Sequence, residues 1–195
     1  MKIPVVKIWV LPKGTMPERQ TDGSIGYDVR IRAVVSPFEI DPVYPQLRRT
    51  LFDFEKIPDD PSLASRIHLR PREDNKSTEL VYRMEPEESV TVGIGFVTEM
   101  SFPLFYWVAP RSGLASKWGI TVTNAPGTVD PDYRGEAGVV VSNRNKKHFD
   151  LRLGMRIAQI IFQWAVIPQF VSVGRPEELH ITNRGAGGFG STGLK

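Results

Sequence analysis

Hydrophobic residues occur along this chain in short runs that turn-forming residues separate. The runs rich in β-branched and aromatic residues are 5–11, 27–35, 79–84, 89–100, 104–109, 137–142, 148–153, 156–166 and 169–173. In residues 27–32 polar and apolar side chains alternate, which is typical of a strand with one face in solvent. Because 16 prolines and 17 glycines are spread along the chain, few windows can hold a long helix, and the best candidate is residues 112–117 followed by Gly119. The pattern predicts an all-β fold such as a sandwich, jelly roll or barrel.

Two segments depart from this pattern. Residues 36–78 contain six of the prolines, little alternation, and seven basic against eight acidic residues. They are predicted to form a surface insertion between strands, and a partner-binding or regulatory module is the alternative. Residues 184–195 are rich in glycine and have almost nothing to bury, so a flexible C-terminal arm is expected.

Composition narrows the class of protein. A chain of 195 residues with 41% hydrophobic and 24% charged residues is typical of a globular domain with a real core. The net charge of +3 is mild; it suits a polyanionic small molecule, and no nucleic-acid binding is expected. The absence of cysteine excludes disulfides, thiolate zinc sites and a cysteine nucleophile. The sequence has no pattern of a signal peptide or a membrane span, so we expect a soluble, cytoplasmic protein without membrane contacts.

The glycine-rich tail nearly matches two phosphate-binding patterns. Residues 185–190 satisfy G-x-G-x-x-G, but too few residues follow for the helix that a dinucleotide fold requires. The tail also lacks the lysine and the helix of a P-loop. Its glycine backbone, its hydroxyls and Arg184 nevertheless offer donors for phosphates, and Phe189 offers a ring that could stack on a base. The alternative is a glycine-rich terminus without a binding role.

An anion site is the first candidate inside the chain. In residues 109–115 a strand is predicted to end where a helix begins, with Arg111 and Ser112 at the junction. Free main-chain N–H groups, a hydroxyl and a guanidinium together suit an anion, whereas an ordinary N-cap serine beside a surface arginine is the alternative. The three histidines are too isolated for a zinc site, so the metal expected is Mg²⁺ carried on substrate phosphates.

Residues 124–136 are the second internal candidate and are predicted to form a hairpin bounded by proline and glycine. The Asn124 amide both donates and accepts, so it could read a pyrimidine edge. The Asp130 carboxylate, placed at a predicted strand end, could activate water. Asp132 is better suited to capping a turn.

Taken in order, these segments resemble the five-motif pattern of trimeric dUTPases. The matching segments are residues 26–29 with Ala33, 110–115, 127–136, 154–161 and 184–193. The resemblance covers residues 1–35 and 79–195, whereas residues 36–78 have no counterpart in compact members of the family. Met155 stands where the fourth motif often has an aspartate that is mainly architectural.

The resemblance implies a jelly-roll-like β-clip fold, with a single β domain at residues 1–183 and the arm at residues 184–195. It implies a homotrimer whose active sites are shared between subunits, and Mg²⁺-dependent hydrolysis of dUTP to dUMP and pyrophosphate. Asp130 would be the general base for water attacking the α-phosphate, Tyr133 would exclude the 2′-hydroxyl of UTP, and Asp28 would reach Mg²⁺ through water. The substrate-binding positions that the resemblance implies are Arg111, Ser112, Gly113, Asn124, Gly127, Thr128, Val129, Tyr133, Gln159, Arg184, Gly188, Phe189, Gly190, Ser191 and Thr192.

Two other functions fit the same resemblance less well. A dCTP deaminase of this fold would need a glutamate where Val140 stands and an arginine where Ser116 stands, and neither residue can serve. A dUTPase-like regulatory protein would act on a protein partner through residues 36–78, but the presence of both Asp130 and Tyr133 indicates that catalysis would persist.

Overall fold

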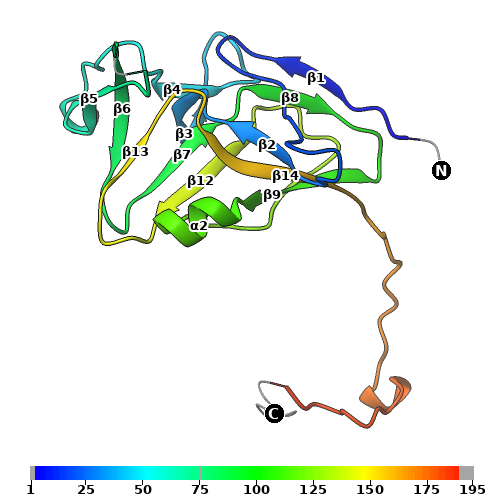
Figure 1. Ribbon diagram of the computed structural model, residues 1–195. Coiled ribbons are helices and arrows are strands. Elements are labelled where there is room, and N and C mark those ends of the chain that lie inside the picture. Colours follow the sequence, from blue (N-terminus) through cyan, green and yellow to red (C-terminus); the bar gives the residue numbers. More distant parts are fainter. Residues whose placement is uncertain (1–2, 75, 189–195) are drawn as a thin grey trace. The chain divides into compact units, whose positions relative to one another are not determined.

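Antiparallel β-sheets dominate the computed structural model, which describes residues 3–74 and 76–188 (Figure 1). The five-stranded sheet has the order β10 (Ile120–Val122), β12 (Gly138–Asn143), β7 (Ser89–Gly93), β3 (Ala33–Ile40) and β4 (Arg48–Phe52). The four-stranded sheet has the order β11 (Gly127–Val129), β9 (Leu104–Pro110), β14 (Arg156–Trp164) and β2 (Tyr27–Arg30). The smaller sheets are β13 (Phe149–Leu151), β6 (Thr78–Met84) and β5 (Ile67–Pro71), and β1 (Lys7–Val10) with β8 (Phe96–Glu99). The described helices are α1 (Pro61–Ala64), α2 (Ser112–Trp118) and the 3₁₀ turn Pro176–Glu178, so the all-β prediction is confirmed.

The chain changes sheets inside two runs that were predicted as single strands. Residues 27–35 form β2 in the four-stranded sheet and β3 in the five-stranded sheet, because the Ile31 N–H donates to Met155 whereas the next N–H, of Arg32, donates to Gly93. Residues 89–100 divide at Gly95, whose φ of +77° suits a residue without a Cβ. The predicted strand at residues 169–173 is wrong, since those residues pair with no strand within the described chain.

Residues 36–78 were predicted to form a surface insertion between strands, and the surface part of that prediction is wrong, because the segment adds strands to two sheets and buries side chains. The segment extends β3, forms β4 at the edge of the five-stranded sheet, and forms β5 at the edge of the three-stranded sheet. Phe52 and Phe54 are buried, with ring centroids 4.6 Å apart, and Ile67 is buried in the same core. Because burying one such side chain stabilises a fold by about 1.5–3 kcal/mol, the insertion is part of the domain core.

Two compact units are present, Met1–Ala165 and Val166–Lys195. The first holds all the sheets and the hydrophobic core. The described part of the second is largely irregular and exposes large apolar side chains, among them Val166, Phe170 and Ile181. Within the described ranges, no helix has both the length and the apolar character that crossing a bilayer would demand.

Helix α2 begins and ends close to the predicted residues. It buries Leu114 and ends at Gly119, which has a φ of +65°. A Cβ at Gly119 would also lie 3.0 Å from the main-chain nitrogen of Asn145. Both the backbone conformation and the close approach therefore require glycine here.

We expect Gly119→Ala to destabilise the fold by about 1–2 kcal/mol, because a Cβ is strained in the left-handed conformation. Chemical denaturation at a fixed protein concentration measures the loss. Gly113→Ala is the matched control in the same helix, since a Cβ at Gly113 meets open space and alanine is the better helix former. Equal midpoints for the parent and Gly119→Ala would contradict this account of the helix end.

Candidate active site

Three of the predicted motifs meet on neighbouring strands of the four-stranded sheet. Gln159 on β14 lies opposite Asp28 on β2 and, on its other side, opposite Ala109 on β9. Arg111 and Ser112 follow directly after β9, at the start of α2. Side chains directly opposite each other in an antiparallel pair share a face, about 5 Å apart. The register therefore brings Asp28, Arg111, Ser112 and Gln159 into one cluster.

The Asp28 carboxylate lies between two guanidinium groups. Arg111 Nε donates to Oδ1 at 3.0 Å, and Arg156 Nη1 donates to Oδ2 at 3.1 Å. Arg111 Nη1 also donates to the main-chain oxygen of Arg156 at 3.2 Å. The Asp28 side chain is only 11% exposed, so its charge is largely committed to orienting these two arginines. Sequence reasoning gave Arg156 no role, although it stands inside the fourth motif.

Gln159 connects the strands of this cluster. Its Nε2 donates to the main-chain oxygen of Pro110 at 3.0 Å, which fixes the end of β9 just before Arg111. Its side-chain oxygen lies against Gly26, where any Cβ would collide with it. A side chain at position 26 would therefore have to displace the Gln159 amide from the end of β9.

The start of α2 differs from one of the sequence-based alternatives. Arg111, not Ser112, is the N-cap residue, with φ −90° and ψ 124° and no side-chain capping bond. Ser112 is the first helical residue, and both it and Gly113 are exposed. The interpretation of Ser112 as an ordinary N-cap is wrong. The Leu114 N–H donates to the Arg111 oxygen at 3.0 Å, whereas the N–H groups of Ser112 and Gly113 are the ones that a helix start leaves without an intrahelical acceptor.

The third motif lies at the other edge of the same sheet. Strand β11 pairs with β9, and Asp130 follows it immediately with an exposed side chain. The Tyr133 N–H donates to the main-chain oxygen of Asp130 at 3.2 Å, and the Tyr133 hydroxyl donates to that of Glu136 at 3.1 Å. The Asn124 amide lies over Gly127. These contacts give the motif a defined turn with an exposed carboxylate.

The predicted hairpin within residues 124–136 is wrong. Strand β10 before it pairs with β12, whereas β11 pairs with β9. The segment therefore crosses from the five-stranded sheet to the four-stranded sheet, and proline and glycine here mark a crossing loop.

Glu136 is the last residue of the third motif, and its side chain holds the motif to the core. No role was predicted for this residue from the sequence. It is fully buried, and its two carboxylate oxygens accept from Arg32 Nε and Nη2, each at 2.8 Å. Oε1 also accepts from the Gly95 N–H at 2.9 Å. A buried charge needs this degree of pairing to offset its desolvation. A charged residue next to an apolar strand was the only local signal, and it did not identify the partner.

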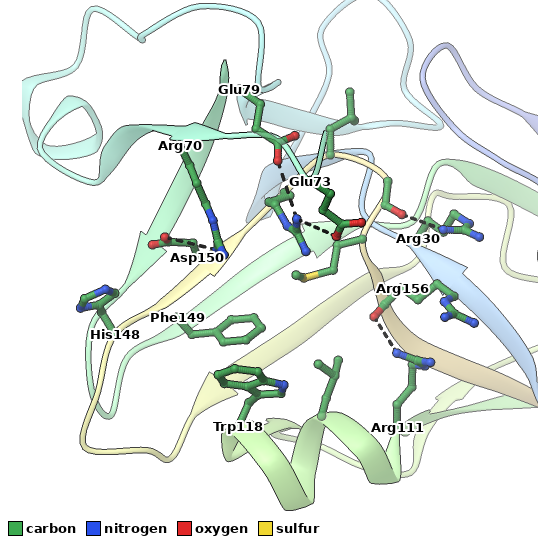
Figure 2. Close-up of a pocket in the computed structure, with 15 residues that line it drawn as sticks. Arg30, Arg70, Glu73, Glu79, Arg111, Trp118, His148, Phe149, Asp150 and Arg156 are labelled. Carbon is green, nitrogen blue, oxygen red and sulfur yellow. Dashed lines mark hydrogen bonds and ion pairs between the residues drawn. The ribbon is translucent and has the colours of Figure 1, made fainter. Parts of the chain in front are cut away.

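A cavity of about 820 Å³ adjoins the Asp28 cluster, between α2, the turn before β14 and the end of β5 (Figure 2). The residues labelled there are Arg30, Arg70, Glu73, Glu79, Arg111, Trp118, His148, Phe149, Asp150 and Arg156. Arginines outnumber carboxylates among its lining residues, which suits a polyanion. Of the predicted site residues only Arg111 lines this cavity, so most of the predicted site lies outside it.

The predicted site residues thus fall into separate groups. Asp28, Arg111, Ser112, Gly113 and Gln159 form one; Asn124, Gly127, Thr128, Val129, Asp130 and Tyr133 form another. Arg184 and Gly188 belong to the second compact unit, where Arg184 Nε donates to the Gly187 oxygen at 2.8 Å. Phe189, Gly190, Ser191 and Thr192 lie outside the described residues.

The described side chains limit how a metal could be held. Across residues 3–74 and 76–188, no three His, Cys, Asp or Glu side chains are grouped closely enough to coordinate an ion. Asp28 is the carboxylate of the cluster, and both of its oxygens already accept from arginines. This arrangement fits a contact through water to a cation that arrives on phosphates, and it does not fit a protein cage.

Comparison with known proteins identifies the family. A family model described as dUTPase matches residues 78–193. The deoxyuridine 5′-triphosphate nucleotidohydrolase of Heliobacterium modesticaldum is 35% identical over 197 residues, which cover 100% of this chain and 98% of that protein. That of Nautilia profundicola is 46% identical over 110 residues, covering 56% of this chain and 75% of that one.

Solved structures agree on the fold. A variant of the Staphylococcus bacteriophage 80alpha dUTPase with dUpNHpp has a TM-score of 0.63 at 17% identity, covering 97% of this chain and 99% of that chain. The likeness confirms the jelly-roll-like β-clip fold. The Heliobacterium match spans the whole of this chain, residues 36–78 included. From the family model and the full-length relative, the chain belongs to the dUTPase family.

Proposed function

We propose that the two groups of site residues, brought together from neighbouring chains, carry out the reaction of this family. As a dUTPase, the protein hydrolyses dUTP to dUMP and pyrophosphate. The observation that carries the proposed residue roles is the strand register, which clusters Asp28, Arg111 and Gln159 and leaves Asp130 exposed at the end of β11.

Asp130 is the proposed general base. Within the described chain no ion pair engages its carboxylate, so it is available to a water molecule. Asp130 takes a proton as the water oxygen attacks the α-phosphorus; the bond to the β-phosphate oxygen breaks, and pyrophosphate leaves. Tyr133 packs against the deoxyribose, and Asn124 to Gly127 read the uracil ring.

Arg111 and Ser112 bind the phosphate chain, with Gln159 holding the strand end that presents them. The guanidinium groups of Arg111 and Arg156 are oriented by Asp28 and neutralise charge that develops on the phosphate oxygens. Asp28 would hold Mg²⁺ through water, and the ion would supply charge neutralisation for the triphosphate.

The separation of the two groups supports a site shared between chains. Extending the strand register places Asp130 level with Gln163 of β14, two strands away. Gln163 in turn lies four residues from Gln159 along the same strand. At about 3.3 Å per residue and about 4.8 Å per strand, the Cα atoms of Asp130 and Gln159 are roughly 16 Å apart within one chain. One α-phosphate cannot contact both side chains at that distance, whereas groups from two copies can converge on it.

A homotrimer gives three such shared sites. Within the second compact unit, Val166–Lys195, we assign residues 166–183 to a segment that connects the β domain to the arm, and residues 184–195 to the arm, which closes over a site on another subunit. There Phe189 stacks on uracil, and Arg184, Ser191 and Thr192 contact the γ-phosphate.

Truncation after Thr182 should lower kcat/KM for dUTP by about 100-fold, because the arm's donors and ring are lost from the closed site. The thermal midpoint should stay unchanged, since the buried core residues all precede Val166. Deleting only Leu194 and Lys195, which follow the fifth motif, is the control and should leave turnover intact. Parental kinetics in the longer truncation would refute arm closure.

Pyrophosphate release from dUTP, dCTP, dTTP and UTP, each with Mg²⁺ and with a chelator, tests the proposed function. We expect release from dUTP alone and its loss on chelation. Deamination of dCTP would instead favour the alternative enzyme of this fold, although Val140 and Ser116 supply neither of the groups that such an enzyme needs. Equal release from UTP would contradict the role of Tyr133.

A further inference from the structure

The tip of the β3–β4 connection, residues 41–47, is an ordered turn. The Asp41 N–H donates to the Leu47 oxygen at 2.8 Å, and the Leu47 N–H donates to the Tyr44 oxygen at 2.8 Å. Asp41 Oδ1 accepts from the N–H groups of Val43 at 2.9 Å and Tyr44 at 3.0 Å. The hydrogen bond from the Tyr44 N–H has the largest effect on the Asp41 carboxyl and that from the Val43 N–H the next largest, and both lower its pKa. The tip therefore holds one conformation although most of its side chains are exposed.

This insertion tip contacts the third motif directly. The main-chain oxygen of Gln46 accepts a hydrogen bond from the Glu136 N–H at 2.7 Å. A cavity of about 420 Å³ between them is lined by residues 45–48 on one side and 132–135 on the other. Arg48, which lines this cavity, packs so closely on Gly138 that a side chain at position 138 would collide with the Arg48 side chain. The contact thus joins the insertion to the segment that carries the proposed base.

Glu136 links the insertion tip to two other parts of the protein, the core through its carboxylate and Tyr133 through its main chain. Its carboxylate is fixed in the core by Arg32 and the Gly95 N–H. Its main-chain oxygen accepts from the Tyr133 hydroxyl, and the Tyr133 N–H closes the turn on Asp130. A displacement of the Glu136 main chain would therefore move both the Tyr133 ring and the Asp130 turn.

We propose that the insertion tip is a positioning element for the third motif, with the Gln46–Glu136 main-chain hydrogen bond setting where Tyr133 and Asp130 stand. The inference rests on the proposed roles of those two residues. The tip touches no substrate; it acts through Glu136. Its loss lowers turnover, because the base is misplaced, and weakens discrimination against the 2′-hydroxyl, because the Tyr133 ring is no longer fixed.

Variants of the tip alone are needed, because deleting residues 36–78 would also remove Phe52 and Ile67 from the core. Replacing residues 42–46 by Asn-Gly shortens the tip by three residues and joins Asp41 to Leu47 through a favoured two-residue turn, so that the main-chain oxygen before Leu47 no longer has the conformation in which Gln46 accepts from Glu136. Asp41→Ala removes the acceptor that orders the tip, and Asp41→Asn restores it. Asp60→Ala is the matched control.

Asp60→Ala removes a similar side-chain acceptor from the insertion but does not affect the contact between the insertion tip and the third motif. Asp60 also accepts from a main-chain N–H two residues on, that of Ser62 at 2.9 Å, and also lies in the insertion. Its described hydrogen bonds stay within residues 60–64. Any effect common to both aspartates would therefore reflect loosening of the insertion in general.

Hydrogen exchange of the peptide containing Glu136 and steady-state kinetics with dUTP and UTP are the paired measurements. We expect the tip replacement to speed exchange at Glu136 and to lower both kcat for dUTP and the dUTP/UTP preference about 10-fold. Asp41→Ala should change the same quantities in the same direction by about 3-fold, and Asp41→Asn and Asp60→Ala should match the parent.

Parental exchange, turnover and preference in the tip replacement would overturn the proposal. So would an equal effect of Asp60→Ala and Asp41→Ala. The exchange measurement does not depend on catalysis, so a failure of the Asp130 assignment would leave the contact itself testable. Conversely, if the contact between Gln46 and Glu136 proves unimportant, the kinetics of Asp130→Asn still test whether Asp130 is the general base.

Discussion

Replacing Asp130 by asparagine should reduce kcat for dUTP by about 10²–10⁴-fold, the usual contribution of a positioned general base. The amide keeps the size of the side chain but cannot take a proton from water. Because the side chain is exposed and makes no ion pair within the described chain, the fold should be unaffected. Steady-state kinetics measure the loss, and calorimetric titration with dUTP should show affinity within about 3-fold of the parent.

Asp132→Asn is the matched control for this experiment. Asp132 is a second exposed carboxylate in the same turn and is expected to serve the turn only. Its replacement should leave kcat within about 3-fold of the parent. Parental turnover in Asp130→Asn, or an equal loss in Asp132→Asn, would show that the base has been assigned to the wrong carboxylate.

Glu136→Gln should destabilise the protein by about 3–5 kcal/mol, because it leaves Arg32 charged, buried and without its counterion. Both groups lie almost entirely out of solvent and share two bonds of 2.8 Å. Denaturant unfolding at one fixed protein concentration measures the loss, since assembly contributes to stability.

The exposed pair Lys7–Glu99 provides the comparison, with side chains 73% and 52% exposed at 2.8 Å. Glu99→Gln should cost less than about 1 kcal/mol, because solvent screens an exposed ion pair. Arg32→Met combined with Glu136→Gln should recover part of the loss seen with Glu136→Gln alone. Similar losses for Glu99→Gln and Glu136→Gln would contradict the importance of burial here.

Local sequence patterns were sufficient where one segment determines its own structure. The turn residue Gly119 predicted the end of α2, and the alternation in residues 27–32 predicted β2. The resemblance to trimeric dUTPases implied that Asp28, Arg111 and Gln159 belong to one site, and the strand register brings these three residues together.

Long-range contacts were not predictable from local patterns. Arg32 and Glu136 are 104 residues apart, and nothing near either residue specifies the other. The change of sheet at Ile31 depends on partners at Met155 and Gly93. Strand β4 was missed because it lies at a sheet edge, where exposed and half-buried residues replace regular alternation.

Mixed assemblies of Asp130→Asn and Arg111→Ala chains test the sharing of the site most directly. The two chains are co-expressed with different tags, and assemblies that carry both tags are purified. In either mixed trimer, one of the three interfaces combines an intact Arg111 with an intact Asp130, so we predict about one third of parental kcat per trimer although each variant alone is inactive. Mixed assemblies as inactive as the single variants would contradict a site completed by a neighbouring chain.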